Sequence, residues 1–310
     1  MKRLKTASDI ETIEQLARAV EQHPDFKVLR RLQPRRSFGV WDGEEEVVQV
    51  AVVDTETTGM NADRDEIIEL GLVVVAVGAQ SGLAFDVLES YGGLEEPLGP
   101  IPLETTRVHG ITDAMVAGQR IDDQRVETML KNVGLVIAHN ANFDRRFLEK
   151  RLPVFARLPW ACSVKDVAWH EEGFRSQKLD YILMQCGYFH EAHRAEADCL
   201  ALLEVLQRPL EKAGGVAMTQ LLRAANQKRY RIWAVNSPFD AKDALKAVGY
   251  RWEAAVRCWN LETSEVALDE ELRRLKQLAF PNREATITLE TLDARVRFSD
   301  RSGFREVRFI

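Results

Sequence analysis

A valine-rich run at residues 47–53 leads directly into two carboxylates, Asp54 and Glu56. Because side chains alternate between the two faces of a strand, both acids lie on the same face. Two acids at the end of a buried strand are costly unless a cation neutralises them, and a hard divalent metal is the simplest compensation. A solvent-exposed strand end explains the pair equally well when this segment is considered alone.

Two more β-rich runs follow, at residues 67–77 and 83–88, with turn-forming residues between them. A fourth apolar run at 134–138 lies among segments with helical periodicity, at residues 121–132, 142–151, 177–186 and 195–208. Strands first, followed by mixed strands and helices, predict a layered α/β domain over residues 47–210.

The flanking segments predict additional units, because 310 residues exceed what one compact core usually organises. Residues 1–46 predict an N-terminal extension with a helix at 8–22 and a hairpin whose turn is Asp42-Gly43. Its arginines are interpreted as a solvated face or as contacts to a nucleic-acid backbone. Residues 211–227 predict a linker that includes a helix at 218–225.

Residues 228–310 predict a small accessory domain of α+β type. Its expected elements are a strand at 230–235, a helix at 238–248 and tail strands around residues 287–289, 296–298 and 307–309. Three aromatic side chains, Tyr250, Trp252 and Trp259, are interleaved with arginines. This pattern is typical of nucleic-acid binding and also of a small core built around tryptophan. We therefore expect this domain to bind nucleic acid or another protein.

The net charge of −6 excludes a protein that holds nucleic acid mainly by bulk electrostatic attraction, because phosphates must be neutralised by clustered Lys and Arg. A local exception is residues 221–260, where eight Lys and Arg residues face three acids. No apolar run approaches the roughly 20 residues that span a bilayer. The basic start, residues 1–5, has no apolar signal core after it, so we expect a cytoplasmic protein without a membrane partner.

A further acid, Asp144, follows the apolar run at 134–138. Asn140 or Asn142 can cap the next helix, which places Asp144 in the first helical turn, where the helix dipole favours a negative charge. This favourable position is by itself a sufficient structural explanation for the acid.

His193 and Asp198 stand five residues apart at the start of a helix with a long apolar stripe. Five helical residues rotate about 140° beyond one full turn, so the two side chains would point apart if both were helical. We therefore expect His193 to precede the helix, in a loop that folds over the site that Asp198 faces. A solvated histidine in an acidic loop is the alternative.

Taken together, three segments resemble the motifs of the DEDDh exonucleases in order and wording. They are Asp54-Thr55-Glu56-Thr57-Thr58-Gly59, His139-Asn140-Ala141-Asn142-Phe143-Asp144 and His193-Arg194-Ala195-Glu196-Ala197-Asp198. Residues 108–112 are similar to a loop that lies beside the terminal nucleotide in these enzymes. The resemblance covers residues 47–208 and extends to the epsilon proofreading subunits of bacterial DNA polymerase III.

The resemblance implies a ribonuclease-H-like fold, with a mixed five-stranded sheet flanked by helices, and a site for two Mg²⁺ or Mn²⁺ ions. It implies that Asp54 bridges both metals, that Glu56 and Asp198 hold the metal that activates water, and that Asp144 acts on the second metal largely through water. His193 is the implied general base. Four carboxylates against two divalent cations roughly cancel, which allows an anionic substrate to approach.

The resemblance also implies a substrate pocket. Thr57 faces the terminal 3′-hydroxyl, Val108 and His109 flank the last base, and Asn140 and Phe143 shape the pocket. Core packing explains Phe143 equally well, and an ordinary loop position explains His109 equally well.

The expected function is a 3′→5′ exonuclease that hydrolyses DNA from a free 3′ end in repair or proofreading, with single-stranded DNA as the expected partner. A polymerase or repair protein is a second expected partner, through residues 228–310. The alternatives are an exoribonuclease that trims RNA 3′ ends and a non-catalytic nucleic-acid-binding protein.

Overall fold

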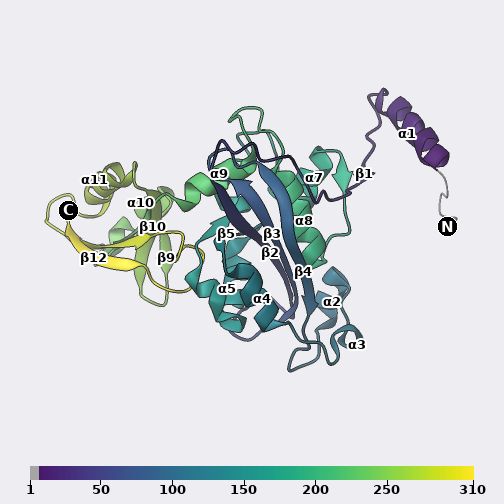
Figure 1. Ribbon diagram of the computed structural model, residues 1–310. Coiled ribbons are helices and arrows are strands. Elements are labelled where there is room, and N and C mark those ends of the chain that lie inside the picture. Colours follow the sequence, from purple (N-terminus) through teal and green to yellow (C-terminus); the bar gives the residue numbers. More distant parts are fainter. Residues whose placement is uncertain (1–6) are drawn as a thin grey trace.

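The computed structural model describes residues 7–310, with side chains from residue 11 onward; residues 1–6, which include the basic start of the expected extension, lie outside the described residues. Two five-stranded sheets stand beside each other, and helix α1 (Ala7–Glu21) and the C-terminal sheet lie at opposite ends of the molecule (Figure 1). Among the described residues, no helix is long and apolar enough to cross a membrane.

The main sheet has the strand order β4-β3-β2-β5-β6. Its strands are β2 (Val47–Thr57), β3 (Ile67–Gly78), β4 (Ala84–Leu94), β5 (Val133–Ala138) and β6 (Trp160–Cys162). β4, β3 and β2 pair antiparallel, whereas β2, β5 and β6 pair parallel. The expected mixed five-stranded sheet is therefore confirmed, and β6 supplies the strand that the apolar runs did not indicate.

Helices cover both faces of the main sheet, which is why its strands are apolar on both sides. The helices of this region are α2 (Leu103–His109), α3 (Asp113–Val116), α4 (Asp123–Leu130), α5 (Ala141–Arg151), η1 (Pro153–Arg157), α6 (Ser163–Asp166), α7 (Leu179–Gln185), α8 (Ala195–Leu206) and α9 (Ala217–Ala225). Val50 and Val52 pack on the face of α8 and α9. Ala51 and Val53 pack on the face of α4 and α5.

The N-terminal extension follows the prediction in its helix and departs from it in its hairpin. Strand β1 (Arg30–Arg31) pairs in parallel with β7 (Tyr188–Phe189). No hairpin forms at Asp42-Gly43, so that prediction is wrong. A type I′ turn needs positive φ at both central residues, and only Gly43 has it. Residues 36–38 instead join the open edge of β4, where the Phe38 amide donates to the Phe85 carbonyl at 2.7 Å.

The arginines of the extension are paired within the chain. Arg30 lies 2.8 Å from Glu14 and 2.7 Å from Glu21, and Arg35 lies 2.8 Å from Glu204 on α8. These ion pairs help to hold the extension, while the side chains of Arg31, Arg35 and Arg36 remain 52%, 48% and 57% exposed, in agreement with a solvated face.

The C-terminal sheet has the order β12-β11-β8-β10-β9, with all neighbours antiparallel. Its strands are β8 (Arg229–Ala234), β9 (Arg251–Glu253), β10 (Cys258–Ser264), β11 (Thr286–Leu292) and β12 (Phe304–Phe309), and its helices are η2 (Phe239–Ala241), α10 (Lys242–Ala247) and α11 (Leu268–Ala279). Both α10 and α11 pack on one face of the sheet. The α+β architecture agrees with the prediction, although α11 was not expected.

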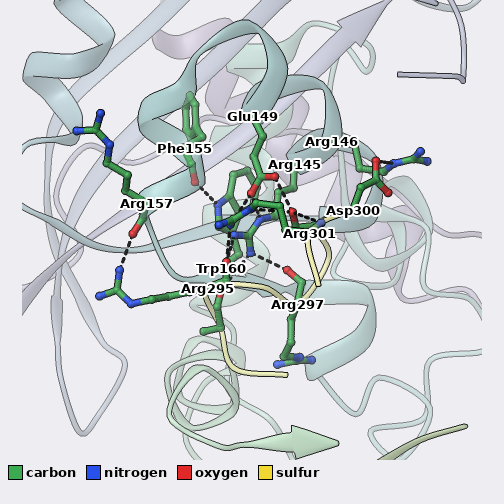
Figure 2. Close-up of polar contacts among 12 residues, drawn as sticks. Arg145, Arg146, Glu149, Phe155, Arg157, Trp160, Arg295, Arg297, Asp300 and Arg301 are labelled. Carbon is green, nitrogen blue, oxygen red and sulfur yellow. Dashed lines mark hydrogen bonds and ion pairs between the residues drawn. The ribbon is translucent and has the colours of Figure 1, made fainter. Parts of the chain in front are cut away.

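The tail strand expected at residues 296–298 does not form. Residues 293–303 make a loop, here named the docking loop, and its backbone points into the main domain. Arg145 of α5 is fully buried and donates to the carbonyls of Ala294, Arg297 and Arg295 at 3.1, 2.6 and 2.5 Å (Figure 2). Burial lowers the pKa of Arg145 to about 10, opposed by Glu149 one helical turn away. The docking loop thus supplies the acceptors that this buried guanidinium requires.

Further contacts surround this buried arginine. The Trp160 amide of β6 donates to the Ala294 carbonyl at 2.7 Å, so the docking loop contacts the edge strand of the main sheet. On the surface, Arg146 pairs with Asp300 at 2.7 Å (Figure 2). The C-terminal sheet is therefore attached to the helix that carries Asp144.

Candidate active site

Three carboxylates meet at the end of β2. Oxygen atoms of Asp54, Glu56 and Asp198 all lie within 4.8 Å of one another. Asp54 and Glu56 continue the alternation of Val50 and Val52, so both acids face α8, which carries Asp198. The prediction that the pair shares one face of the strand agrees with this geometry.

A glycine allows α8 to come this close. Gly71 of β3 pairs with Asp54, and a Cβ atom at Gly71 would lie 2.2 Å from the backbone of Ala195, the first residue of α8. Any other residue would push the helix away from the sheet. Glu69, two residues earlier, accepts from the Ala195 amide at 3.1 Å and from Arg194 at 2.9 Å. The start of α8 is thereby fixed against β3.

Burial and mutual repulsion set the protonation of these acids. Both causes raise the pKa of Asp54 well above its ordinary range, burial being the larger. They raise the pKa of Glu56 to about 8, with Asp198 the strongest of the neighbouring charges. A group of acids that resists ionisation in this way is complementary to a divalent cation with oxygen ligands, so the donor set fits such a metal.

Asp144 approaches from the other face of the sheet. It lies in the first turn of α5, as expected, and its Oδ1 accepts from the amide and the hydroxyl of Thr55 at 3.0 and 2.9 Å. Burial raises its pKa to about 7, while the hydrogen bonds from Thr55 oppose that rise. Asp144 is therefore adjacent to the three-carboxylate group without belonging to it. Asn140 is the N-cap residue, but its side chain forms no capping hydrogen bond, contrary to the expectation.

His193 stands just before α8, in a left-handed backbone conformation with φ of 64°. The rotation argument that required it to leave the helix is confirmed. Its ring is half-exposed, and Nδ1 lies 3.9 Å from Oε1 of Glu56. The imidazole is thus on the solvent side of the acidic group.

His190 is a residue that sequence reasoning missed. Its Nε2 lies 2.5 Å from Oδ1 of Asp198, and its Nδ1 lies 3.5 Å from Asp180. The other oxygen of Asp198 accepts from the Arg194 amide at 3.1 Å. Both oxygens of Asp198 are therefore held in place. The only signal in the sequence was a second histidine three residues before His193.

Comparison with known protein families identifies the family of the chain. The sequence pattern of the exonuclease family matches residues 51–206. The chain belongs to this exonuclease family. That match contains Asp54, Asp144, His193 and Asp198, and the resemblance to the DEDDh exonucleases is confirmed.

Two relatives show how far the similarity extends. The DNA polymerase III subunit epsilon of Treponema pallidum is 30% identical over 172 residues, which cover 52% of this chain and 75% of that subunit. The PolC-type DNA polymerase III of Thermotoga petrophila is 28% identical over 207 residues, or 64% of this chain and 14% of that polymerase. The exonuclease chain therefore spans only a small part of the PolC-type relatives.

Two solved structures are similar to the exonuclease at low TM-scores. One is exonuclease X in complex with 5′-overhanging duplex DNA, with a TM-score of 0.39 and 24% identity, covering 55% of this chain and 99% of that chain. The other is the nuclease domain of 3′hExo, a DEDDh family member bound to rAMP, with a TM-score of 0.40 and 18% identity, covering 53% and 91%.

The residues expected to contact the substrate differ in how far they are buried in the structure. Thr57 is buried, and its hydroxyl donates to the Gly59 carbonyl at 2.6 Å. Val108 is 57% exposed, whereas His109 is buried. Both were expected in a loop, which is wrong, because they form the last turn of α2 before Gly110, whose φ of 72° ends the helix.

His109 retains unused hydrogen-bonding capacity. Its Nδ1 accepts from the Ile111 amide at 3.0 Å, and its Nε2 is buried without a partner among the described residues. Burial lowers the pKa of this ring, which favours the neutral imidazole with a proton on Nε2.

The two expected pocket residues in the segment 139–144, Asn140 and Phe143, differ in their exposure to solvent. Asn140 is exposed at the end of β5. Phe143 is half-buried, and its ring lies 4.9 Å from that of Phe147 in the core beneath α5. Packing therefore accounts for at least one side of the Phe143 ring.

Proposed function

We propose that this exonuclease removes nucleotides from the 3′ end of DNA, with catalysis by two divalent metal ions, in repair or proofreading. The observation that carries the proposal is the meeting of Asp54, Glu56 and Asp198 within 4.8 Å in a chain of the exonuclease family. The substrate is a strand with a free 3′ end, and single-stranded DNA is the preferred form.

Asp54, Glu56, Asp144 and Asp198 would hold two Mg²⁺ or Mn²⁺ ions. When bound, such a pair generates a nucleophile from water at neutral pH and stabilises the leaving oxygen. Asp54 would contact both ions, Glu56 and Asp198 would hold one of them, and Asp144 would act largely through water. The hydrogen bonds from His190 and from the Arg194 amide fix the direction of the Asp198 carboxylate, so His190 is a positioning residue.

His193 would take the proton from the attacking water. Its half-exposed ring lies next to Glu56 and outside the helix, so the ring reaches the substrate side of the acidic group. A neutral imidazole is a suitable proton acceptor near neutral pH.

The nucleotide pocket would be formed by Thr57, Val108, His109, Asn140 and Phe143. The buried Nε2 of His109 needs an acceptor, and the exposed Val108 side chain offers an apolar surface to a base. The relationship to an epsilon subunit further suggests a polymerase or repair protein as a partner, through residues 228–310.

The test is degradation of single-stranded DNA labelled at its 5′ end, with Mg²⁺ or Mn²⁺. We expect a ladder of products shortened from the 3′ end, and its loss in Asp54→Asn. Glu127→Gln on α4, an exposed acid outside the site, is the matched control and should keep full activity. Turnover by Asp54→Asn, or shortening from the 5′ end, would contradict the proposal.

A matched RNA strand in the same assay separates DNA hydrolysis from RNA 3′-end trimming. Faster degradation of the RNA would replace DNA as the substrate while leaving the proposed chemistry intact. Strand binding without turnover in either metal would instead indicate a non-catalytic protein.

A further inference from the structure

A cleft of about 840 Å³ lies between the C-terminal sheet and the main domain. Asn142 and Arg146 of α5 and Lys165 of α6 line one side. The other side is the face of the C-terminal sheet that α10 and α11 leave uncovered. We name this space the interdomain cleft.

Alternation along β8 determines what the sheet presents to the cleft. Arg229, Arg231 and Trp233 line the cleft, whereas Ile232 and Ala234 point into the core formed with the helices. The neighbouring strands continue this polar face through residues that pair with β8 or β10. The open face of a two-layer domain is thus built from arginine and tryptophan.

The lining is strongly cationic although the chain carries a net charge of −6. Eight of the lining residues are Lys or Arg and four are Asp or Glu. The cations are Arg146, Lys165, Arg229, Arg231, Arg251, Arg297, Arg301 and Arg305. Small-molecule pockets are mostly apolar, so this composition indicates a polyanionic occupant.

Three of these cations have no partner inside the protein. Arg231 pairs with Glu262 and Glu290, as the arginines of the N-terminal extension pair with their own acids. By contrast, the side chains of Lys165, Arg229 and Arg251 make no hydrogen bond or ion pair with any described residue. Their charges are available to a ligand.

Strand β9 presents Arg251 to the cleft, because Arg251 pairs with Asn260, which in turn pairs with Trp233. Trp252 lies on the opposite face of the sheet: it pairs with Trp259, which pairs with Ala234 of the helix-covered core, and the two indole rings pack edge-to-face with centroids 5.7 Å apart. The cleft face of β9 therefore offers a cation suited to a phosphate.

We propose that the interdomain cleft binds the single-stranded part of the nucleic-acid substrate, with Lys165, Arg229 and Arg251 on phosphates. This rests on the proposed function, because the cleft begins at Asn142, two residues before Asp144. An acidic protein segment is the competing occupant; a strand is favoured because the proposed substrate of the neighbouring acidic centre carries a phosphate on every nucleotide.

The binding experiment uses the full-length chain with Asp54→Asn, so that strand affinity is measured without hydrolysis. The probe is labelled oligothymidylate of about 20 nucleotides, longer than the roughly 4–16 that one small binding domain covers. We expect Arg229→Gln with Arg251→Gln to lower affinity about 10-fold at low salt. The slope of log K against log salt should fall by roughly 1.4, since each phosphate contributes about 0.7.

The matched control is Lys246→Gln with Arg273→Gln. It also removes two exposed cations from the C-terminal domain, but on α10 and α11, away from the cleft. Its affinity and salt slope should equal those of the parent protein. Cross-linking of a strand that carries 5-bromouracil gives a second readout without changing the cleft, and we expect the adduct on residues that line the cleft.

Unchanged affinity and salt slope in the double cleft variant would overturn the proposal, as would an adduct outside the cleft. A variant that keeps oligothymidylate but loses a polyglutamate peptide would assign the cleft to a protein partner instead. Because binding is measured in a hydrolysis-free background, these outcomes are independent of whether the wild-type chain degrades DNA from the 3′ end.

Discussion

The main sheet and the C-terminal sheet each have five strands, yet they present opposite charges. The main sheet brings Asp54, Glu56 and Asp198 together at one strand end. The C-terminal sheet turns Arg229 and Arg231 towards the interdomain cleft. One surface repels a phosphate until cations bind it, and the other attracts a phosphate directly.

Net charge is therefore a poor guide to what such a chain binds. A charge of −6 argues against bulk attraction to nucleic acid. The acids, however, are concentrated where metal chemistry needs them, and free cations are concentrated where a strand would lie. An acidic protein can therefore bind an anionic polymer when the acids that would hold metal ions and the cations that would bind the strand lie on separate sheets.

The two surfaces meet in α5, in two consecutive residues. Asp144 accepts from Thr55 at the end of the main sheet. Arg145 donates to the docking loop of the C-terminal domain. One helical turn thus holds both an acid of the candidate active site and the principal attachment of the second sheet.

The largest expected effect comes from Asp54→Asn. Loss of a central metal ligand should lower kcat roughly 1,000-fold, or about 4 kcal/mol, because the ions supply several kcal/mol of transition-state stabilisation. Strand affinity should stay unchanged, since Asp54 is not part of the interdomain cleft. Parallel turnover and binding assays check this, with Glu127→Gln as the control. If strand binding were lost together with turnover, hydrolysis and strand binding would not be separate functions of the two sheets.

Arg145→Leu is expected to destabilise the fold by about 3 kcal/mol, because it leaves the buried carbonyls of the docking loop without donors. Chemical denaturation measures this. The matched variant is Arg146→Gln, which removes the partly exposed ion pair with Asp300 and should cost less than about 1 kcal/mol. Equal effects of the two variants would show that the attachment is a surface contact only.

The pH dependence of stability tests the carboxylates of the candidate active site. In the folded state the pKa of Glu56 is about 8 and that of Asp144 about 7, both above the ordinary carboxylate range. The folded metal-free protein therefore retains protons that the unfolded chain releases, so the stability contributed by these two acids is full below about pH 4 and is lost as pH rises through 7 to 8.

Mg²⁺ should counteract that loss, because it replaces the protons. At about a hundredfold excess over Kd we expect Tm to rise by roughly 5 °C near pH 8 and much less near pH 5. Thermal unfolding with Mg²⁺ or with EDTA measures both values. A rise of equal size at the two pH values would mean that the metal binds elsewhere.

The sequence predicted those helices and strands whose hydrophobic residues form a long, clear pattern. The runs that became β2, β3 and β5 are apolar throughout because helices cover both faces of the main sheet. β6 spans only Trp160–Cys162, too short for any pattern. The prediction of a hairpin at Asp42-Gly43 was wrong because the preceding residues pair with the edge of β4 instead.

The candidate site was predictable where spacing determines geometry. Alternation placed Asp54 and Glu56 on one face, and helical rotation placed His193 outside α8. His190 and Arg145 were not predictable, because their roles depend on tertiary partners. Arg145 and Arg297 are separated by 152 positions, and no local sequence pattern predicts a contact over such a distance.

That separation has a consequence for the timing of biosynthesis. At roughly 5–20 residues per second, a ribosome adds Ala294 to Arg297 about 7 to 30 s after Arg145. During this interval the guanidinium has none of its final backbone acceptors, and the helix that carries Asp144 remains incompletely anchored. The contacts that join the candidate active site to the interdomain cleft can therefore be complete only after Arg297 has been added.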